Sequence, residues 1–241
     1  MDCLDEEYKV RYSETDCNGR LKLKSFLDYA QEIAGEHAEA LGVGVAKLRE
    51  AHRAWLLSRV KIQISAYPAV GNIVTVRTYP QGFDRLFARR EFRFLDSACN
   101  CIAQASSLWL LVDMSAARIL PAQQEAGALM PDNSGLPIAF PALGKITPDD
   151  GHETLLQCTV RDTQIDLNGH LNNAEYAGLV QDALGMGRYP REFQINYQKA
   201  IPPRSPLAIT GEISGDGFIL TGRVAGAISF ECAGTLMAPR P

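Results

Sequence analysis

The chain has 241 residues, 46% of them hydrophobic and 22% charged, a composition typical of a globular protein with a sizeable core. A formal net charge of −4 argues against a nucleic-acid-binding protein, because a phosphate-binding surface normally leaves a basic excess. No stretch approaches the roughly 18 uninterrupted apolar residues of a membrane span. We therefore expect neither a nucleic acid nor a membrane as partner.

The start of the chain is acidic and resembles neither a secretory signal nor a transit peptide. Six cysteines lie at positions 3, 17, 99, 101, 158 and 232, without any Cys-x-x-Cys pair. A disulfide framework is not expected in such a chain. These features favour a protein of the reducing cytoplasm.

The first long element follows a polar turn at 15–21. Apolar residues recur at spacings of three and four from Phe26 to Leu41, which predicts one face of an amphipathic helix that ends at Gly42. Alternating polar and apolar residues, and one longer apolar run, then predict strands at 61–65, 73–77, 91–94 and 103–113.

Residues 121–150 carry many prolines, glycines and alanines, which indicates a linker with little sheet of its own. A second amphipathic helix is predicted from Tyr176 to Leu184, before Gly185. It is followed by predicted strands at 193–197, 207–213, 218–224 and 228–237.

An internal repeat organises these elements. Thr15–Leu21 and Ile165–Leu171 match at a constant offset of 150 residues, and a helix and strands follow each copy. One helix on one face of a sheet leaves a second surface to bury, so the halves should pack on each other. The prediction is an α+β tandem double hot-dog, a pseudo-dimer of a repeat at 1–120 and a repeat at 151–241, joined by the linker 121–150.

The candidate chemistry lies in the second copy, at Asp166, Asn168 and His170. In an extended stretch these side chains would point to one side and could supply a base or nucleophile, a carbonyl-polarising donor and a proton shuttle. The adjacent helix N-terminus favours developing negative charge. Ordinary helix capping by Asp and Asn is the alternative reading. The first copy has Arg20 where the second has His170, and a guanidinium cannot exchange protons near neutral pH, so the second turn is expected to be the reactive one.

The motif Asp166–Asn173, followed by Tyr176, resembles the active-site motif of acyl-ACP thioesterases, and Arg11–Asp16 and Trp55–Ile62 resemble the first half of that family. The resemblance implies a thioester hydrolase of fatty acid biosynthesis that releases fatty acid from acyl carrier protein, its partner. It further implies that Asp166, Asn168 and His170 are catalytic and that the first repeat shapes the acyl tunnel. One departure is that this chain has Ala200 and Ile201 where plant members carry a glutamate and a cysteine.

We expect residues of the first helix and one tryptophan to bound the acyl chain or to pack directly beneath it, with plain core packing as the alternative reading: Phe26, Leu27, Ala30, Ile33 and Trp55. The acidic carrier protein should be attracted by local basic residues, for which a solvated charged surface is the alternative reading. Two clusters are candidates: Arg85, Arg89, Arg90 and Arg93 in one hairpin, and Lys22 and Lys24 beside the first turn.

Several functions remain open at this point. The alternatives are a hot-dog acyl-CoA thioesterase, an acyl-binding protein weakened in catalysis by the loss of the carboxylate at Ala200, and an enoyl hydratase. A homodimer is also left open. We expect no metal, because four histidines form no H-x-x-x-H pair, and no cofactor, because no nucleotide-binding motif is complete.

Overall fold

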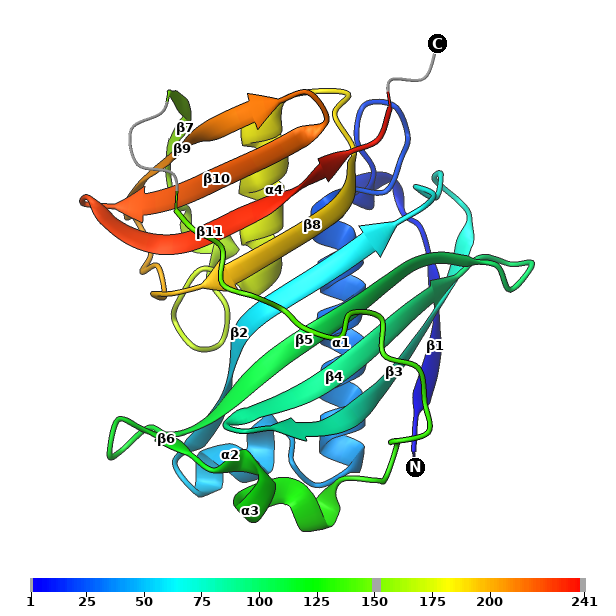
Figure 1. Cartoon of the computed structure of the whole chain (residues 1–241), viewed down its shortest axis with the longest axis vertical. Coiled ribbons are helices and arrows are strands. Elements are labelled where there is room, and N and C mark those ends of the chain that lie inside the picture. The colour runs from blue at the N-terminus through cyan, green and yellow to red at the C-terminus, as the bar shows by residue number, and fades with distance from the viewer. Residues whose placement is uncertain (1, 149–152, 239–241) are drawn as a thin grey trace.

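The computed structural model describes residues 2–148 and 153–238, which form two similar halves (Figure 1). The first half contains β1 (Leu4–Lys9), α1 (Leu23–Ala40), α2 (Val45–Glu50), β2 (Arg53–Ile64), β3 (Ile73–Asp84), β4 (Phe87–Leu95), β5 (Cys101–Asp113) and β6 (Arg118–Leu120). The second contains β7 (Thr154–Thr159), α4 (Asn173–Leu184), β8 (Pro190–Tyr197), β9 (Pro206–Ser214), β10 (Gly217–Val224) and β11 (Ala227–Leu236). The short helix α3 (Ala122–Ala126) lies between them.

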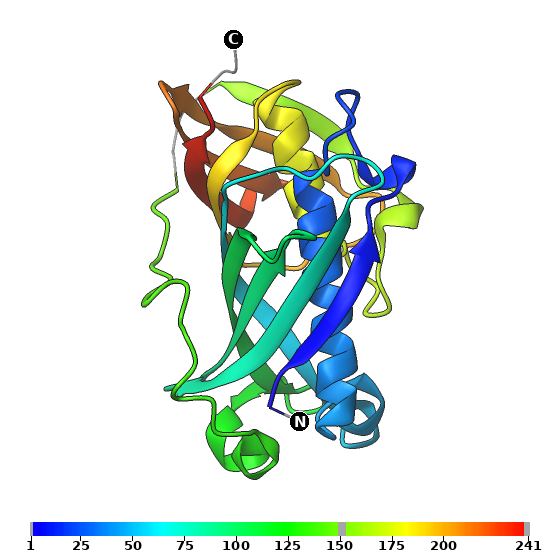
Figure 2. The ribbon, with the colours of Figure 1, turned by 90° about the vertical axis from the view of Figure 1, so that its right-hand side faces the viewer.

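The strands of both halves form one continuous antiparallel sheet. Within the described residues its order is β1-β3-β4-β5-β2-β8-β11-β10-β9-β7, with β6 on β5. The halves are joined where β2 pairs with β8, with Val60 opposite Ile195. Both long helices lie on one side of this sheet and the linker on the other (Figure 2). The predicted double hot-dog is therefore confirmed.

The two long helices form where apolar residues repeat at helical spacing. The buried side chains of α1 include Leu23, Phe26, Ala30 and Ile33, which pack on the sheet and on α4. The helix α4 begins at an Asn172 cap and ends at Gly185, whose φ of 88° few other residues adopt. Both predicted helices are confirmed; each begins three residues earlier than its apolar pattern.

The predicted strands are confirmed, but β2, β3 and β4 are longer than expected. The alternation of polar and apolar residues is lost within β2 because the pairing register with β5 shifts between Leu57 and Arg59. The sequence pattern therefore predicted only the last part of this strand. The helix α2 was not predicted, since Gly42 indicated only the end of α1. The Glu39 carboxylate holds α2 by accepting a hydrogen bond from the Ala46 N–H at 3.2 Å.

Hydrogen bonds hold the linker against the face of the sheet that lies opposite the two long helices. Tyr79 Oη on β3 donates a hydrogen bond to Pro137 O at 2.6 Å, and Gln194 Nε2 on β8 donates to Gly144 O at 2.8 Å. In Figure 1 it crosses in front of the first-half strands toward the second half. The segment predicted as a linker thus contacts both halves, and it also contains the helix α3.

Candidate active site

The second-copy turn is tight rather than extended. Asp166 Oδ1 accepts the Asn168 N–H at 2.8 Å, the Asp166 N–H donates to His170 O at 2.9 Å, and the Gly169 N–H donates to Asp166 O at 3.0 Å. Gly169 adopts a φ of 77°, which reverses the chain. The expectation that strand alternation puts three side chains on one side is therefore wrong, because the glycine breaks the alternation.

This turn brings two of the three predicted catalytic side chains together. Asn168 Nδ2 lies 3.4 Å from Asp166 Oδ2, and both residues line the main cavity described below. The side chain of His170 is exposed, and within the described residues its imidazole makes no hydrogen bond to either of them. His170 therefore lies at the open end of the turn.

The N-terminus of α4 is already capped. Asn172 Oδ1 accepts the Ala174 N–H at 2.8 Å, and Asn172 O accepts the Glu175 N–H at 2.9 Å. These two first-turn donors are not free to bind an oxyanion, contrary to the expectation from the helix position. The side-chain amide of Asn168 remains the donor that points to the same cavity.

The main cavity lies between the second-copy turn and the first half, with a volume of about 570 Å³. Its walls come from α1, α2, β2, β3, β4 and β5, and its apolar lining includes Ala34, Ala38, Val43, Val45, Leu48, Ala54, Trp55, Phe83, Ala88 and Trp109. Asp166 and Asn168 complete the lining at one end. The cavity can accommodate an apolar chain with a polar group at this turn.

The residues predicted to contact an acyl chain are divided between three places. Trp55 lines the main cavity, whereas Leu27 and Ala30 line a separate cavity of about 30 Å³. Phe26 and Ile33 line neither cavity; they are fully buried in the core, where Phe26 packs edge-on against two aromatic rings.

The part of α1 that does face the main cavity escaped prediction. It consists of Gln31, Glu32, Ala34, Gly35 and Ala38. Ala34 and Ala38 belong to the predicted apolar stripe, which was assigned to core contacts, while Gln31, Glu32 and Gly35 beside it look like solvent-exposed surface. The small residues at 34, 35 and 38 were the available signal, since they leave space beside the helix.

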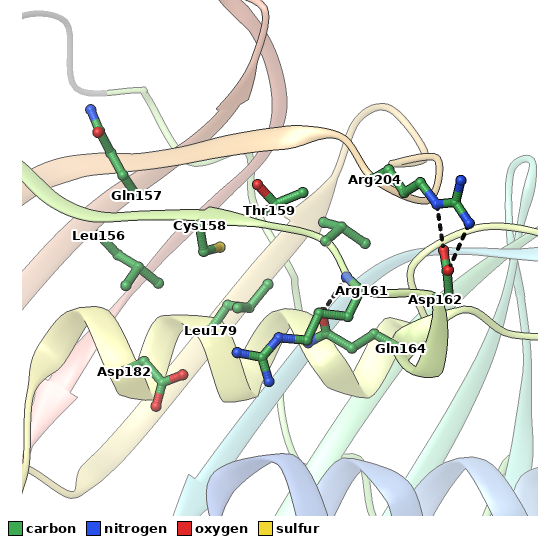
Figure 3. Close-up of a pocket in the computed structure, with 11 residues that line it drawn as sticks. Leu156, Gln157, Cys158, Thr159, Arg161, Asp162, Gln164, Leu179, Asp182 and Arg204 are labelled. Carbon is green, nitrogen blue, oxygen red and sulfur yellow. Dashed lines mark hydrogen bonds and ion pairs between the residues drawn. The ribbon is translucent and has the colours of Figure 1, made fainter.

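A second, open groove of about 770 Å³ lies between β7 and α4 (Figure 3). In the first half the corresponding space holds the stacked rings of Tyr8 and Tyr29, with centroids 4.4 Å apart. In the second half the positions 150 residues later are Cys158 and Leu179, whose smaller side chains leave the groove open. None of the predicted catalytic residues lines it, so we place the candidate chemistry in the main cavity.

The first-copy turn is closed by a tyrosine from the second half. Tyr189 Oη donates to Asp16 Oδ2 at 2.7 Å and accepts from Asn18 Nδ2 at 2.8 Å. The guanidinium of Arg20 lies 4.7 Å from the centre of the same ring. The first turn therefore holds a protein side chain where the second turn borders a cavity.

The predicted arginine cluster on the β3–β4 hairpin does not form a surface patch. Arg85 is exposed, but Arg89 and Arg90 are buried on opposite faces of β4. Arg89 lies under the linker and pairs with Glu91 at 2.6 Å, while Arg90 lies under α1 next to His37. The cluster prediction was wrong because both faces of this strand are covered.

The lysines beside the first turn are also engaged within the chain. Lys22 Nζ donates to Ser13 O at 2.9 Å, and Lys24 pairs with Asp28 at 2.7 Å. Neither forms a free basic patch.

Ala200 is exposed and lies close to the second turn. The Leu171 N–H, directly after His170, donates to Ile201 O at 2.8 Å. The segment that carries Ala200 is thus adjacent to the end of the turn.

In residues 2–148 and 153–238, no group of three or more His, Cys, Asp or Glu residues is arranged to hold a metal ion. No helix in this described part of the chain is long and apolar enough to cross a membrane.

Solved structures with the same fold include an acyl-ACP thioesterase from Bacteroides thetaiotaomicron, 22% identical, with a TM-score of 0.85 and 98% of each chain covered. A 12:0-ACP thioesterase from Umbellularia californica is 18% identical, with a TM-score of 0.81, covering 98% of this chain and 97% of the other. At these identities the likeness shows the shared fold.

Sequence relatives include the chloroplastic oleoyl-acyl carrier protein thioesterase of Coriandrum sativum, 26% identical over 197 residues, which cover 74% of this chain and 53% of the relative. The chloroplastic palmitoyl-acyl carrier protein thioesterase of Arabidopsis thaliana is 22% identical over 245 residues, covering 94% and 58%. The chain spans about half the length of these curated relatives. The family model of the acyl-ACP thioesterase N-terminal domain matches residues 2–130, and that of the C-terminal domain matches residues 148–220. The chain belongs to the acyl-ACP thioesterase family.

Proposed function

We propose that this protein hydrolyses the thioester of fatty acyl carrier protein and releases a free fatty acid, as part of fatty acid biosynthesis. One observation carries the proposal: an apolar cavity of about 570 Å³ ends at Asp166 and Asn168, whereas Tyr189 fills the matching place at the first turn. Family membership agrees with this chemistry. All six cysteines are free thiols, which favours a reducing compartment such as the cytoplasm.

The cavity supplies binding energy for the acyl chain. Each methylene transferred from water to such a surface contributes about 0.8 kcal/mol. An acyl chain that lies against Trp55 and Ala38 would leave its thioester carbonyl at the turn, beside Asn168. Binding far from the reacting atoms then positions the carbonyl for attack.

The turn can divide the hydrolysis between its three polar residues. Asp166 accepts a proton from a water molecule as the water oxygen bonds to the carbonyl carbon. The carbonyl electron pair moves onto oxygen, where the Asn168 amide stabilises the negative charge by donating a hydrogen bond. When the tetrahedral intermediate collapses, the carbon–sulfur bond breaks and the protonated imidazole of His170 gives its proton to the leaving thiolate. Solvent then carries the proton held by Asp166 back to His170, which restores both side chains.

In this division of roles Asp166 activates the water without the help of a second carboxylate. Ala200 occupies the position of the glutamate in the plant pattern and has no group that can activate water. Asp166 is half-buried, and its Oδ1 already accepts the Asn168 N–H. Its Oδ2, which lies 3.4 Å from the Asn168 amide nitrogen, can accept a second hydrogen bond and is the atom we assign to the water.

The carrier protein is proposed to approach next to α2. This helix forms one wall of the cavity and carries two exposed basic residues, Lys47 and Arg49. Arg49 Nη2 also donates to Leu167 O at 3.1 Å, which ties α2 to the candidate catalytic turn. Attraction of an acidic carrier to these residues should weaken as salt is added.

The test is thiol release from acyl-ACP, acyl-CoA and enoyl-CoA of one chain length. We expect turnover of acyl-ACP, and a loss of about 10²- to 10⁴-fold in His170→Ala and Asn168→Ala. Arg20→Ala, at the matching place in the closed turn, is the control and should change the rate far less. Near-wild-type thiol release by a folded His170→Ala protein would contradict the assignment of His170 as the proton donor. A clear preference for acyl-CoA would favour that alternative carrier.

A further inference from the structure

One arginine that lines the main cavity is almost completely buried. Arg90 lies on the face of β4 that packs under α1, and 7% of its surface is exposed. Its Nη1 lies 3.1 Å from His37 Nδ1 and donates to Thr78 Oγ1 at 3.3 Å. Because a guanidinium has only donors, Nδ1 of His37 must be the acceptor in this contact.

Neither His37 nor Thr78 is a carboxylate, and within the described residues no carboxylate forms an ion pair with Arg90. Two other arginines show the usual arrangement: Arg89 pairs with Glu91 at 2.6 Å, and Arg53, which also lines the cavity, pairs with Glu125 at 2.8 Å. Burial alone lowers the pKa of Arg90 to about 10, with no contribution from a neighbouring charge. A buried charge without a counter-ion is costly, so a ligand that supplies one would gain affinity.

Arg90 contacts α1 further along that helix than does the start of α4, the helix that follows the candidate catalytic turn. The turn-side residue Asn173 shares a cavity lining with Gln31 of α1, whereas Arg90 contacts His37 of the same helix. Six residues of helix separate these positions, which corresponds to about 9 Å along the axis. A group at the far end of an acyl chain could therefore reach Arg90 while the other end stays at the turn.

We propose that the cavity binds an apolar chain that carries a carboxylate at its inner end, with Arg90 as the counter-ion. The inference rests on the proposed function in taking this cavity as the acyl site. Two sources have the required chemistry. One is the distal carboxylate of an acyl thioester derived from a dicarboxylic acid; the other is a free fatty acid that enters with its carboxylate first and so inhibits the enzyme.

Equilibrium binding tests the anion site without any need for turnover. Titration calorimetry would compare dodecanoate with 1-dodecanol, which has the same chain but no charge. We expect the acid to bind about 10- to 100-fold more tightly, the usual gain from a charge-assisted hydrogen bond. The preference should vanish in Arg90→Gln and persist in Arg90→Lys. Arg53→Gln is the matched control, since its guanidinium is already paired, and should keep the preference.

Kinetics then distinguish the two sources. If the substrate carries the carboxylate, thioesters with a distal carboxylate should have a higher kcat/KM than plain thioesters of equal length, and Arg90→Gln should abolish the difference. If the source is free fatty acid, dodecanoate should inhibit wild-type protein more strongly than Arg90→Gln.

Two results would overturn the proposal: equal affinity of wild-type protein for dodecanoate and dodecanol, or an undiminished acid preference in a folded Arg90→Gln protein. Arg90→Met replaces the Gln variant if that one does not fold, because an apolar side chain in place of a buried charge is often tolerated. Failure of thiol release would count against the proposed function but would leave the binding comparison intact.

Discussion

Removal of one hydroxyl group, in Tyr189→Phe, should weaken the joint between the two halves without impairing catalysis. The Tyr189 hydroxyl donates to Asp16 Oδ2 at 2.7 Å and accepts from Asn18 Nδ2 at 2.8 Å. The phenylalanine ring would keep its contact with Arg20 and its packing against Tyr67. The variant therefore isolates the two hydrogen bonds that close the first turn.

The expected loss of stability follows from those two bonds. A hydrogen bond to a charged group contributes about 1.5–3 kcal/mol and a neutral one about 0.5–1.5 kcal/mol. Asp16 is half-buried and Asn18 is exposed, so water would replace part of each bond, and we expect a net loss of about 1–2 kcal/mol. For a chain of this size each kcal/mol lowers Tm by about 2–4 °C, which gives a decrease of about 2–8 °C.

Thermal and urea denaturation followed by circular dichroism would measure this loss. Tyr12→Phe is the matched control, because 86% of the Tyr12 surface is exposed, and it should change stability by less than about 0.5 kcal/mol. Thiol release at 25 °C should be unchanged in both variants. Equal stability of the two variants would refute the structural role of Tyr189, and lost activity in a folded Tyr189→Phe protein would show that the first turn takes part in catalysis.

Four further predictions concern the site and its surroundings. Asp166→Asn should abolish most thiol release, and Ala200→Glu should restore part of it by returning a group that can activate water. Ala34→Leu should shorten the preferred acyl chain in a product profile, since one methylene in an apolar pocket is worth roughly 1–3 kcal/mol of discrimination. Arg49→Glu should raise KM for acyl-ACP but not for acyl-CoA, and the effect should fade with added salt. Burial raises the pKa of Tyr176 to about 12, so its contribution to stability should be complete below about pH 10 and lost as pH rises through 12; urea midpoints of Tyr176→Phe should lack this component.

The repeated turn made the fold predictable from sequence. Asp16 and Asp166 each accept the N–H two residues later, and Gly19 and Gly169 each adopt a positive φ, so the local pattern and the local structure agree. The helices that follow were predictable for a similar reason, because their apolar spacing matches their buried faces.

Which residues form and surround the site could not be predicted, because packing between segments far apart in the sequence brings them together. Tyr189 closes a turn more than 170 residues before it, and no local pattern indicates such a contact. Arg89 and Arg90 looked like surface charges because charged residues are usually exposed. This stretch is buried because the linker covers one face of β4 and α1 covers the other.

Fusion of the two repeats into one chain has a consequence for how the halves could diverge. In a dimer of identical subunits related by a two-fold axis, any substitution appears twice, so both turns must stay alike. Here α1 has 18 residues and α4 has 12, and α2 follows only the first of them. A mutation at position 20 leaves position 170 untouched. Fusion thus allows one turn to change, as at Arg20, without any change in the other, whereas a substitution in a symmetric dimer alters both turns at once.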